Sequence, residues 1–358
     1  MNPRDGRGLL DTVGSIRIVL LTGLGDVVHG LPVVNALRRR RPDLRVTWVA
    51  EPMPAGLLAP HPAIDRVVVF RRRAGLEGVL ELRRLLAGDR ADLTLNLNVY
   101  FKSILPTLFQ PSPVRLGFDR DRTRDGVALA CNAHLPAKPR RHTQDMFLEF
   151  LEFLGVAAEP LEWRLGPTPA EQAEQAAFVD SLEGRPMAAI VTASANPKKD
   201  WVADRYIELA ERLHAEAGLR PVLIGGPGGR ETVVARTITD RARAPVIDAR
   251  GDGVRRLIWL ILASRLVIAP DTGPVHIARA LDVPVIGLYG HTNPWRVGPY
   301  RKYHDLWIDR YTEPGARPDP SAFDPKHGRM EQITTDDVMA KVRAALQHHP
   351  RPPQAAPS

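Results

Sequence analysis

The chain has 358 residues, of which 44% are hydrophobic, with 49 Lys and Arg against 41 Asp and Glu, a formal net charge of +8 and a single cysteine. Because a soluble domain usually has about 100–200 residues, this length indicates two domains, or one large one, with ample sequence for a buried core. The single thiol, Cys131, excludes an internal disulfide and a zinc site built from cysteines. A wholly disordered chain and a disulfide-stabilised secreted scaffold are therefore excluded.

Membrane-spanning and export signals are also missing from the sequence. No apolar run approaches the ~18–20 residues that span a bilayer, and the longest one near the start, Ile16 to Leu21, has the length of a strand. The first residues lack the basic segment and long apolar core of a signal peptide. We therefore expect a cytoplasmic protein.

The positive charge raises the question of a polyanionic partner. Only 7 of the 49 cations are lysine, and the arginines are scattered apart from the runs 38–41 and 71–73. The sequence shows no zinc-finger spacing, no aromatic RNA-binding signature and no leucine-zipper heptads. These observations favour a solvated or substrate-facing basic surface, and no nucleic acid is expected as a partner.

The first third of the chain alternates predicted strands and helices. Apolar runs typical of buried strands occur at 16–21, 45–50, 66–70 and 92–97. A glycine-rich turn over 22–30 leads into an amphipathic stretch at 32–42, and a second helical stretch occupies 75–88. This alternation indicates a parallel sheet with helices on both faces.

The same pattern restarts after a predicted helix at 143–155 and a linker rich in Pro and Gly at 156–172. Strands are predicted at 187–193, 220–226, 245–249, 265–270 and 283–290, with helices near 203–217, 229–241, 254–264 and 274–281. The sequence thus predicts an α/β fold of two Rossmann-like domains with parallel sheets facing a cleft. We expect these domains at 1–165 and 166–330, followed by a C-terminal helix at 331–348 and a disordered tail at 349–358.

The first candidate motif, TGLGDVVHG at 22–30, lies where a strand turns into a helix. Glycines such as Gly25 let a backbone approach a ligand closely, and a helix N-terminus offers free N–H groups. A dinucleotide fingerprint would have glycine where Val28 stands, although Glu51 lies roughly where a ribose-binding acid would. Asp26 has two interpretations, a helix N-cap or a general base that removes a proton from a substrate hydroxyl.

The second motif, VTASANPKKDW at 191–201, also follows a predicted strand. Ser194 begins a short polar loop, and Lys198 and Lys199 are two of only seven lysines. A lysine beside such a loop can neutralise charge that develops on a phosphate. The alternative is a solvated lysine pair.

The third motif, at 269–300, is the most specific, and its key residues are Asp271, Thr272, Gly273, Pro274 and His276. Asp or Thr would cap a helix, glycine would let the backbone approach a ligand, and proline would open the helix. We expect the free N–H groups of residues 272–275 to face a diphosphate, with the Thr272 hydroxyl as a further donor. A well-capped structural helix would explain the aspartate and the proline but not the other polar groups.

Two further patterns carry less weight. Asp119-Arg120-Asp121 matches the Asp-x-Asp metal motif of one class of glycosyltransferase, but it lies in a charge-rich loop and is interpreted as solvated. IGGPGGRE at 224–231 lacks the Gly-Lys-Ser/Thr ending of a P-loop. It predicts either a plain strand-to-helix turn or a wall of a nucleotide site, with Glu231 reaching ribose hydroxyls. No convincing metal cluster is seen, so no metal and no resident cofactor are expected.

Three blocks together resemble the heptosyltransferase family, glycosyltransferase family 9. They are GDVVHGLPVVNALRRRRPD, KKDWVADRY and DTGPVHIARALDVPVIGLYG, and the resemblance covers roughly residues 16–345. It implies the GT-B fold, in which two Rossmann-like domains carry the acceptor on the N-terminal side and the sugar-nucleotide donor mainly on the C-terminal side.

The resemblance also implies roles for single residues. Asp26 matches the proposed general base, and Lys199 matches the lysine that stabilises the leaving diphosphate. The donor-binding set comprises Gly25, Ser194, Lys199, Glu231, Asp271, Thr272, Gly273 and His276, with Glu231 as the ribose-binding acid. Such enzymes invert the anomeric centre by direct displacement without a metal.

We therefore predict an inverting glycosyltransferase that moves heptose from ADP-heptose onto a lipopolysaccharide-core or other lipid-linked glycan. The expected partners are the nucleotide-sugar donor, an anionic glycolipid acceptor and, by peripheral contact, the inner face of the cytoplasmic membrane. Basic segments at 38–41, 71–73 and 140–141 are expected to face that acceptor or membrane. The alternatives are a nicotinamide-dependent oxidoreductase and a non-catalytic protein that binds a sugar nucleotide or a polyanion.

Overall fold

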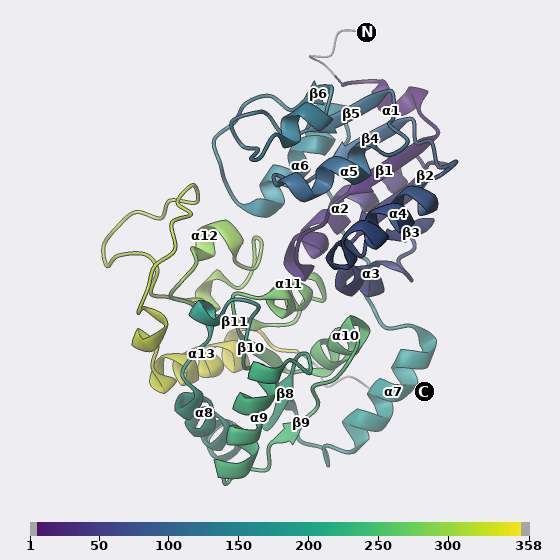
Figure 1. Cartoon of the computed structure of the whole chain (residues 1–358). Coiled ribbons are helices and arrows are strands. Elements are labelled where there is room, and N and C mark those ends of the chain that lie inside the picture. Colours follow the sequence, from purple (N-terminus) through teal and green to yellow (C-terminus); the bar gives the residue numbers. More distant parts are fainter. Residues whose placement is uncertain (1–5, 352–358) are drawn as a thin grey trace. The chain divides into compact units, whose positions relative to one another are not determined.

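The computed structural model describes residues 6–351, which form two compact units that meet in sequence between Arg164 and Leu165. Residues 352–358, most of the tail expected to be disordered, lie outside the described residues. No helix within 6–351 combines the length and apolar character needed to cross a membrane. Each unit is an α/β structure around its own parallel sheet (Figure 1).

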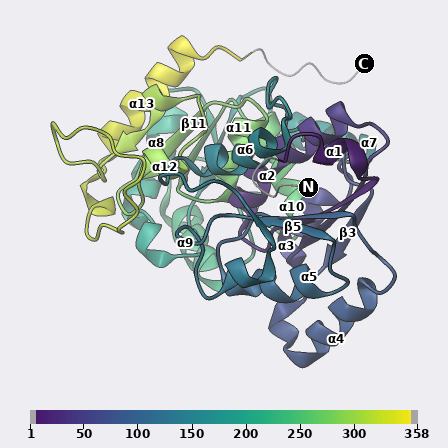
Figure 2. The same ribbon diagram turned by 90° about the horizontal axis from the view of Figure 1, so that it is seen from above.

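The first unit is built on a six-stranded sheet in the order β3-β2-β1-β4-β5-β6. Its strands are β1 (Ser15–Val19), β2 (Arg45–Ala50), β3 (Arg66–Val69), β4 (Leu93–Asn96), β5 (Val114–Gly117) and β6 (Ala133–His134). Its helices are α1 (Leu9–Thr12), α2 (Leu24–Arg40), α3 (Pro52–Leu58), α4 (Leu76–Leu85), α5 (Ile104–Leu108) and α6 (Thr143–Leu154). α2 packs with α3 and α6 on one side of the sheet, and α4 packs with α5 on the other (Figure 2).

The second unit repeats this plan with the order β12-β11-β10-β7-β8-β9. Its strands are β7 (Met187–Val191), β8 (Arg220–Ile224), β9 (Ile247–Asp248), β10 (Leu266–Pro270), β11 (Val285–Tyr289) and β12 (Ile308–Asp309). Its helices are α7 (Pro169–Asp180), α8 (Ala203–Ala215), α9 (Gly229–Arg241), α10 (Val254–Ala263), α11 (Gly273–Ala280), α12 (Pro294–Val297) and α13 (Thr335–His348). The predicted class, two Rossmann-like parallel sheets, is confirmed.

In both sheets the direction of strand succession reverses at one central pair. The pair is β1 and β4 in the first unit and β7 and β10 in the second. In open α/β sheets, ligands bind outside the carboxyl ends of the strands at such a reversal, because the connecting loops diverge there to opposite faces. The loops that follow these four strands are therefore where the fold itself favours a site.

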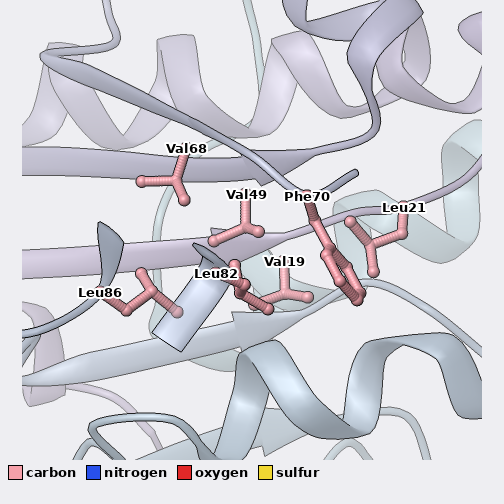
Figure 3. Packing of buried hydrophobic residues seen from close by; sticks show 7 residues of the cluster. All are labelled: Val19, Leu21, Val49, Val68, Phe70, Leu82 and Leu86. Atoms are coloured by element: carbon pink, nitrogen blue, oxygen red, sulfur yellow. The ribbon is translucent and has the colours of Figure 1, made fainter. Parts of the chain in front are cut away.

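The apolar runs of the sequence form the cores, because strands covered on both faces are buried throughout. One core cluster joins Val19, Leu21, Val49, Val68 and Phe70 from the sheet region to Leu82 and Leu86 of the α4 segment (Figure 3). Each of these side chains is at most 2% exposed. This packing fixes which side of α4 faces inward.

The first helix begins earlier than predicted. α2 starts at Leu24, whereas the amphipathic pattern indicated a start at Pro32. Proline usually occupies the first turn of a helix because it lacks an N–H donor. Here Pro32 lies inside the helix, so the glycine-rich segment 24–30 is helical and its glycines are not all turn residues.

Gly30 is a packing residue of α2. A Cβ at this position would lie 2.8 Å from the Trp48 ring of β2 and 3.2 Å from Leu20. We expect Gly30→Ala to reduce the free energy of unfolding by about 1–3 kcal/mol, since overpacking a buried contact forces side chains off their rotamers. Urea unfolding would measure this. Gly166→Ala, in a loop, is the control, because no atom lies within 4 Å of the Cβ position there.

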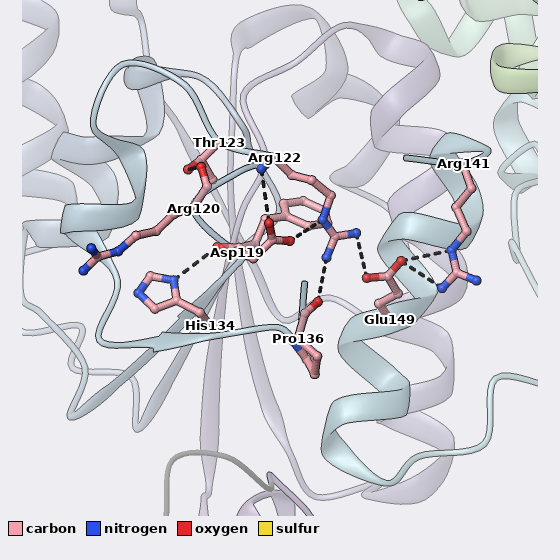
Figure 4. A network of polar contacts seen from close by, with 9 residues as sticks. Asp119, Arg120, Arg122, Thr123, His134, Pro136, Arg141 and Glu149 are labelled. Carbon is pink, nitrogen blue, oxygen red and sulfur yellow. Dashed lines mark hydrogen bonds and ion pairs between the residues drawn. The ribbon is translucent and has the colours of Figure 1, made fainter. Parts of the chain in front are cut away.

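In the Asp119-Arg120-Asp121 loop, Arg120 and Asp121 are exposed as predicted, but Asp119 is buried. Asp119, Arg122 and Glu149 are 7%, 5% and 3% exposed and form a buried ionic network (Figure 4). Arg122 pairs with Asp119 and donates to Glu149 at 2.8 Å, and Arg141 also pairs with Glu149 at 2.8 Å. The prediction for Asp119 was wrong because the local sequence shows only the excess of charge. It does not show that α6 brings Glu149 to Arg122, which in turn pairs with Asp119. Asp119 therefore has a structural partner.

The basic run at 38–41 is neutralised within its own unit. Arg38, Arg39, Arg40 and Arg41 pair with Asp65, Glu162, Asp11 and Asp43 at 2.6, 3.1, 2.8 and 2.7 Å. Arg39 also donates to the carbonyls of residues 157–160. Each of these cations thus has an anionic partner, and contact of this run with an acceptor or a membrane stays a prediction.

Candidate active site

An ion pair joins the two loops at the reversal of the second sheet. Lys199 ends a short 3-10 turn after β7, and Asp271 directly follows β10. Lys199 Nζ lies 2.7 Å from Asp271 Oδ2, and the two side chains are 25% and 8% exposed. An ammonium group has three donors, so the pair leaves N–H groups of Lys199 for oxygen atoms of a ligand. Lys199 is therefore not a solvated lysine, whereas its neighbour Lys198 is exposed.

The start of α11 offers fewer amides than expected. The expectation that residues 272–275 all present free N–H groups is wrong, because residue 274 is proline and the Val275 N–H donates to the Thr272 carbonyl at 3.0 Å. Within residues 6–351, the amides of Thr272 and Gly273 have no partner in the structure. Thr272 is the N-cap, but its hydroxyl makes no capping bond. Two amides and one hydroxyl thus remain for an anion beside Lys199.

Two buried side chains border this region. His276 lies in α11 and is 6% exposed. Tyr289, the last residue of β11, is fully buried, and its hydroxyl has no hydrogen-bond partner in the described part of the chain. Burial raises the pKa of Tyr289 well above its usual range, and the charges of Asp271 and Asp309 raise it further. Tyr289 therefore keeps its proton, and the sequence motif gave no signal for it.

The loop after β7 is held together by its own polar groups. The Ser194 N–H donates to Asp200 Oδ1 at 2.7 Å, and the Ser194 hydroxyl donates to the Asn196 carbonyl at 2.7 Å. Arg230, from the start of α9, pairs with Asp200 at 3.0 Å and also donates to the Ser194 carbonyl. Burial raises the pKa of the Asp200 carboxyl. The Ser194 proton is therefore already used to shape the loop that carries Lys199.

Glu231 lies next to this loop, in the first turn of α9. Its carboxylate accepts the Gly228 N–H, and burial raises its pKa while Arg250 opposes the rise. A Cβ at Gly226 or Gly228 would lie 3.3 Å from Glu231 Oε2, so the glycines let the carboxylate fold back onto its own loop. Contact with a ribose stays a prediction, and it would use the remaining lone pairs of the carboxylate.

The segment 310–330, which no sequence motif covers, also reaches the site through contacts with residues that follow β11. His291, just after β11, has its Nδ1 atom 2.6 Å from the Lys326 carbonyl and its Nε2 atom 3.4 Å from Asn196 Nδ2. A Cβ at Gly290 would lie 2.5 Å from the Met330 nitrogen. The segment 310–330 is thus fastened against the end of β11 and, through His291, to the loop that carries Lys199. Only the fold brings residues so far apart in sequence together.

The predicted residues of the first unit lie at the reversal of their own sheet. Asp26 is the third residue of α2, whose N-cap is Gly23, so the interpretation of Asp26 as the N-cap is wrong. Its side chain is half-buried, and no hydrogen bond or ion pair holds its carboxylate among residues 6–351. Gly25 is half-buried beside it. A carboxylate in a first helical turn is favoured by the helix dipole and is here available to a ligand.

Buried amides shape the neighbourhood of Asp26. Asn98, after β4, donates to the Val19 carbonyl at 2.7 Å and accepts the Leu21 N–H at 3.0 Å. Asn96 accepts the Asn98 N–H at 3.0 Å and donates to Ser103 and Thr107. These bonds tie the chain after β1 to the chain after β4, and so fix the turn from which α2 and Asp26 start.

No metal centre emerges from the part of the chain that the structure describes. No group of three or more His, Cys, Asp and Glu side chains there could hold a metal ion. Cys131 is buried, and burial raises the pKa of its thiol to about 11. The candidate residues are therefore hydrogen-bond donors, ammonium and carboxylate groups.

Comparison with known proteins indicates a glycosyltransferase. The sequence profile described as glycosyltransferase family 9 (heptosyltransferase) matches residues 79–317. A lipopolysaccharide core heptosyltransferase of Haemophilus influenzae, OpsX, is 30% identical over 82% of this chain and 83% of its own length. Lipopolysaccharide heptosyltransferase 1 of Pseudomonas aeruginosa is 28% identical over 80% of this chain and 81% of its own length.

Solved structures share the fold. A family 9 glycosyltransferase of Veillonella parvula matches 93% of this chain and 97% of its own with a TM-score of 0.75 and 22% identity. The Escherichia coli ADP-heptose lipopolysaccharide heptosyltransferase II matches 94% of this chain and 99% of its own with a TM-score of 0.73 and 21% identity. Since the family profile covers most of the chain and the blocks at the sheet reversals lie where this fold binds ligands, the protein is a glycosyltransferase and belongs to family 9.

Proposed function

We propose that the protein transfers heptose from ADP-heptose to a lipopolysaccharide-core or related lipid-linked glycan, with inversion at the anomeric carbon. The observation that carries the proposal is the placement of Lys199, with Asp271, beside the free amides of Thr272 and Gly273 at the reversal of the second sheet. An ammonium group and convergent N–H donors suit a diphosphate. The relatives named above are heptosyltransferases that act on lipopolysaccharide.

The proposed reaction is a single displacement. A hydroxyl oxygen of the acceptor attacks the anomeric carbon of the donor, and its proton passes to the Asp26 carboxylate of the first unit. The new glycosidic C–O bond forms as the bond from the anomeric carbon to the diphosphate oxygen breaks. The electron pair of that bond leaves with the ADP, where Lys199 and the two amides stabilise the added negative charge. Because these groups supply the positive charge, the step as proposed uses no metal.

The other predicted residues have supporting roles in this proposal. Asp271 holds the Lys199 ammonium in place, and the Thr272 hydroxyl donates to the diphosphate. Ser194 shapes the loop of Lys199, and Glu231 contacts the donor ribose. Gly25, Gly273 and His276 border the substrates. We further propose that the reaction takes place at the cytoplasmic face of the inner membrane, where a lipid-linked acceptor would be presented.

A panel of donors tests this function. Thermal unfolding would be followed with ADP-heptose, ADP-glucose, UDP-glucose and NAD⁺, and release of ADP would be measured with a heptose-free lipopolysaccharide acceptor. A ligand at 100 times its Kd stabilises a folded protein by about 2.7 kcal/mol, so ADP-heptose is expected to raise Tm by several degrees. ADP release should then require both donor and acceptor.

Other outcomes of the panel would assign a different function. Stabilisation by another nucleotide sugar, with turnover of that sugar, would replace the donor. Stabilisation by NAD⁺ alone would favour the oxidoreductase alternative. Binding of ADP-heptose without ADP release, for each acceptor tried, would favour the non-catalytic binding protein.

A further inference from the structure

Large apolar side chains are exposed together on one side of the first unit. They are Leu76 (74% exposed), Leu80 (51%), Tyr100 (42%), Phe101 (59%), Leu105 (39%) and Leu108 (42%), and we call them the apolar face. They come from α4, from α5 and from the 3-10 turn that precedes α5. Large apolar residues that are clustered and exposed usually mark an interaction surface.

The core packing of α4 shows that two of its leucines, Leu76 and Leu80, lie away from the core cluster. Leu82 is buried in the core cluster shown in Figure 3, and Val79 and Leu85 pack against that cluster. Leu76, Leu80 and Arg83 follow one another at helical spacing on another side of the helix, and all three are exposed. The outward side of a surface helix normally carries polar residues. Here it carries two leucines.

The α5 segment continues this surface. Ser103, Pro106 and Thr107 are buried, and Phe109 packs against the core cluster, so the exposed residues of this segment lie on the opposite side. Phe101, Leu105 and Leu108 are spaced by four and three residues, as on one side of a helix. α4 and α5 contact one another and lie on the same side of the sheet (Figure 2).

Cations accompany the apolar face. Segments 71–90 and 99–110, which contain it, carry seven Lys and Arg against three Asp and Glu. Arg71 pairs with Glu81, and Arg72 with Glu51. Arg73 and Arg83 are exposed, and neither has an ion pair among residues 6–351. The surface is thus both apolar and positively charged.

We propose that the apolar face docks onto an anionic lipid bilayer. Its leucines and Phe101 would enter the boundary between headgroups and acyl chains, while Arg73 and Arg83 would contact lipid phosphates. The charge of this surface favours lipid as the occupant, because Arg73 and Arg83 have no ion pair among residues 6–351 and anionic headgroups complement such cations. The proposal deepens the proposed function, on whose membrane location it rests, by naming the surface that would contact the bilayer, and it does not depend on which sugar is moved.

Vesicle flotation tests the proposal with the full chain. Vesicles of phosphatidylcholine mixed with phosphatidylglycerol are compared with vesicles of phosphatidylcholine alone, at low salt. We expect wild type to bind the anionic vesicles and Arg73→Gln/Arg83→Gln to bind them roughly 20- to 30-fold more weakly, at about fivefold per charge. Leu80→Ser/Leu105→Ser is expected to weaken binding by about tenfold or more, because the variant loses the favourable transfer of two leucine side chains from water into the bilayer.

Matched controls lie on α9 of the second unit. Val233→Ser removes an apolar side chain that is more exposed than Leu80 and Leu105, and Arg236→Gln removes an exposed arginine. Both should bind vesicles like wild type. Equal loss in the control and test variants would overturn the proposal, as would equal binding of wild type to neutral and anionic vesicles.

A labelling experiment serves if the leucine variant fails to fold. Leu76→Cys carries an exposed thiol, whereas the native Cys131 is buried, so an environment-sensitive dye would report on position 76. Anionic vesicles should shift its emission to the blue. The proposal would be wrong if anionic vesicles caused no shift. It would also be wrong if a higher protein concentration alone caused the shift, because that would indicate contact with a second copy of the chain. The donor panel contains no lipid vesicles. The proposed transfer of heptose and the proposed docking on a bilayer are therefore tested separately, and one can fail without the other.

Discussion

Replacing Lys199 with alanine is expected to lower kcat by about 10²- to 10³-fold. This is the usual effect of removing one preorganised group that stabilises charge in the transition state. Lys199 is mostly buried and held by Asp271 at 2.7 Å, so its ammonium is oriented before the donor binds. The effect should fall mainly on kcat, because the charge on the leaving diphosphate grows as the glycosidic bond of the donor breaks. Steady-state release of ADP measures it.

Lys198→Ala is the matched control, because Lys198 is the adjacent residue and is exposed. It should retain the activity of wild type. Asp271→Asn is expected to give an intermediate loss, since Lys199 keeps its charge but loses its anionic partner. If Lys198→Ala and Lys199→Ala were equally active, the proposed role of Lys199 would be wrong.

Replacing Asp26 with asparagine is expected to lower kcat/KM by about 10²- to 10⁴-fold, the range typical of a lost general base. Asparagine keeps the shape of the side chain but cannot accept the proton. Stability should change little, because Asp26 is not the N-cap of α2 and only its favourable interaction with the helix dipole, about 0.3–1 kcal/mol, is lost. Urea unfolding and ADP release would be measured on the same preparations.

Donor binding and a control variant separate a base from a structural carboxylate. ADP-heptose should still raise the Tm of Asp26→Asn as in wild type, because donor binding requires no proton transfer. Asp204→Asn, which changes an exposed carboxylate in the first turn of α8, is the control and should stay fully active. A fully active Asp26→Asn would leave Asp26 with the dipole interaction alone.

The structure differs from the sequence prediction at the start of α2 and at the start of α11. The amphipathic pattern predicted a helix at 32–42 after a glycine-rich turn over 22–30, but α2 begins at Leu24 and includes most of that turn. At α11 the motif predicted four free amides, and only two remain because of Pro274 and the bond from Val275 to Thr272. Both errors are local. They concern which backbone N–H groups are hydrogen-bonded at the helix ends. This depends on backbone geometry, which residue types constrain only weakly.

Other differences come from partners distant in the sequence. Arg17 stands within a run that was interpreted as an apolar strand, yet it is fully buried and donates to the carbonyls of Phe109 and Gln110 at 2.8 and 3.1 Å. Asp119 was interpreted as solvated and is buried against Arg122. A charged residue is stable in the interior only when such partners exist, and a sequence pattern does not show them.

The sequence pattern alone predicted the parallel α/β class, the strands other than β5, β6 and β12, and the segments that carry Asp26, Lys199 and Asp271. It could do so because the hydrophobic period and the residues at strand ends are local properties. The sequence pattern did not show that Lys199 pairs with Asp271, that Arg38 to Arg41 each have an acidic partner, or that leucines of the contacting helices α4 and α5 are exposed. Ion pairing and burial depend on which distant segments meet, and the fold alone settles that.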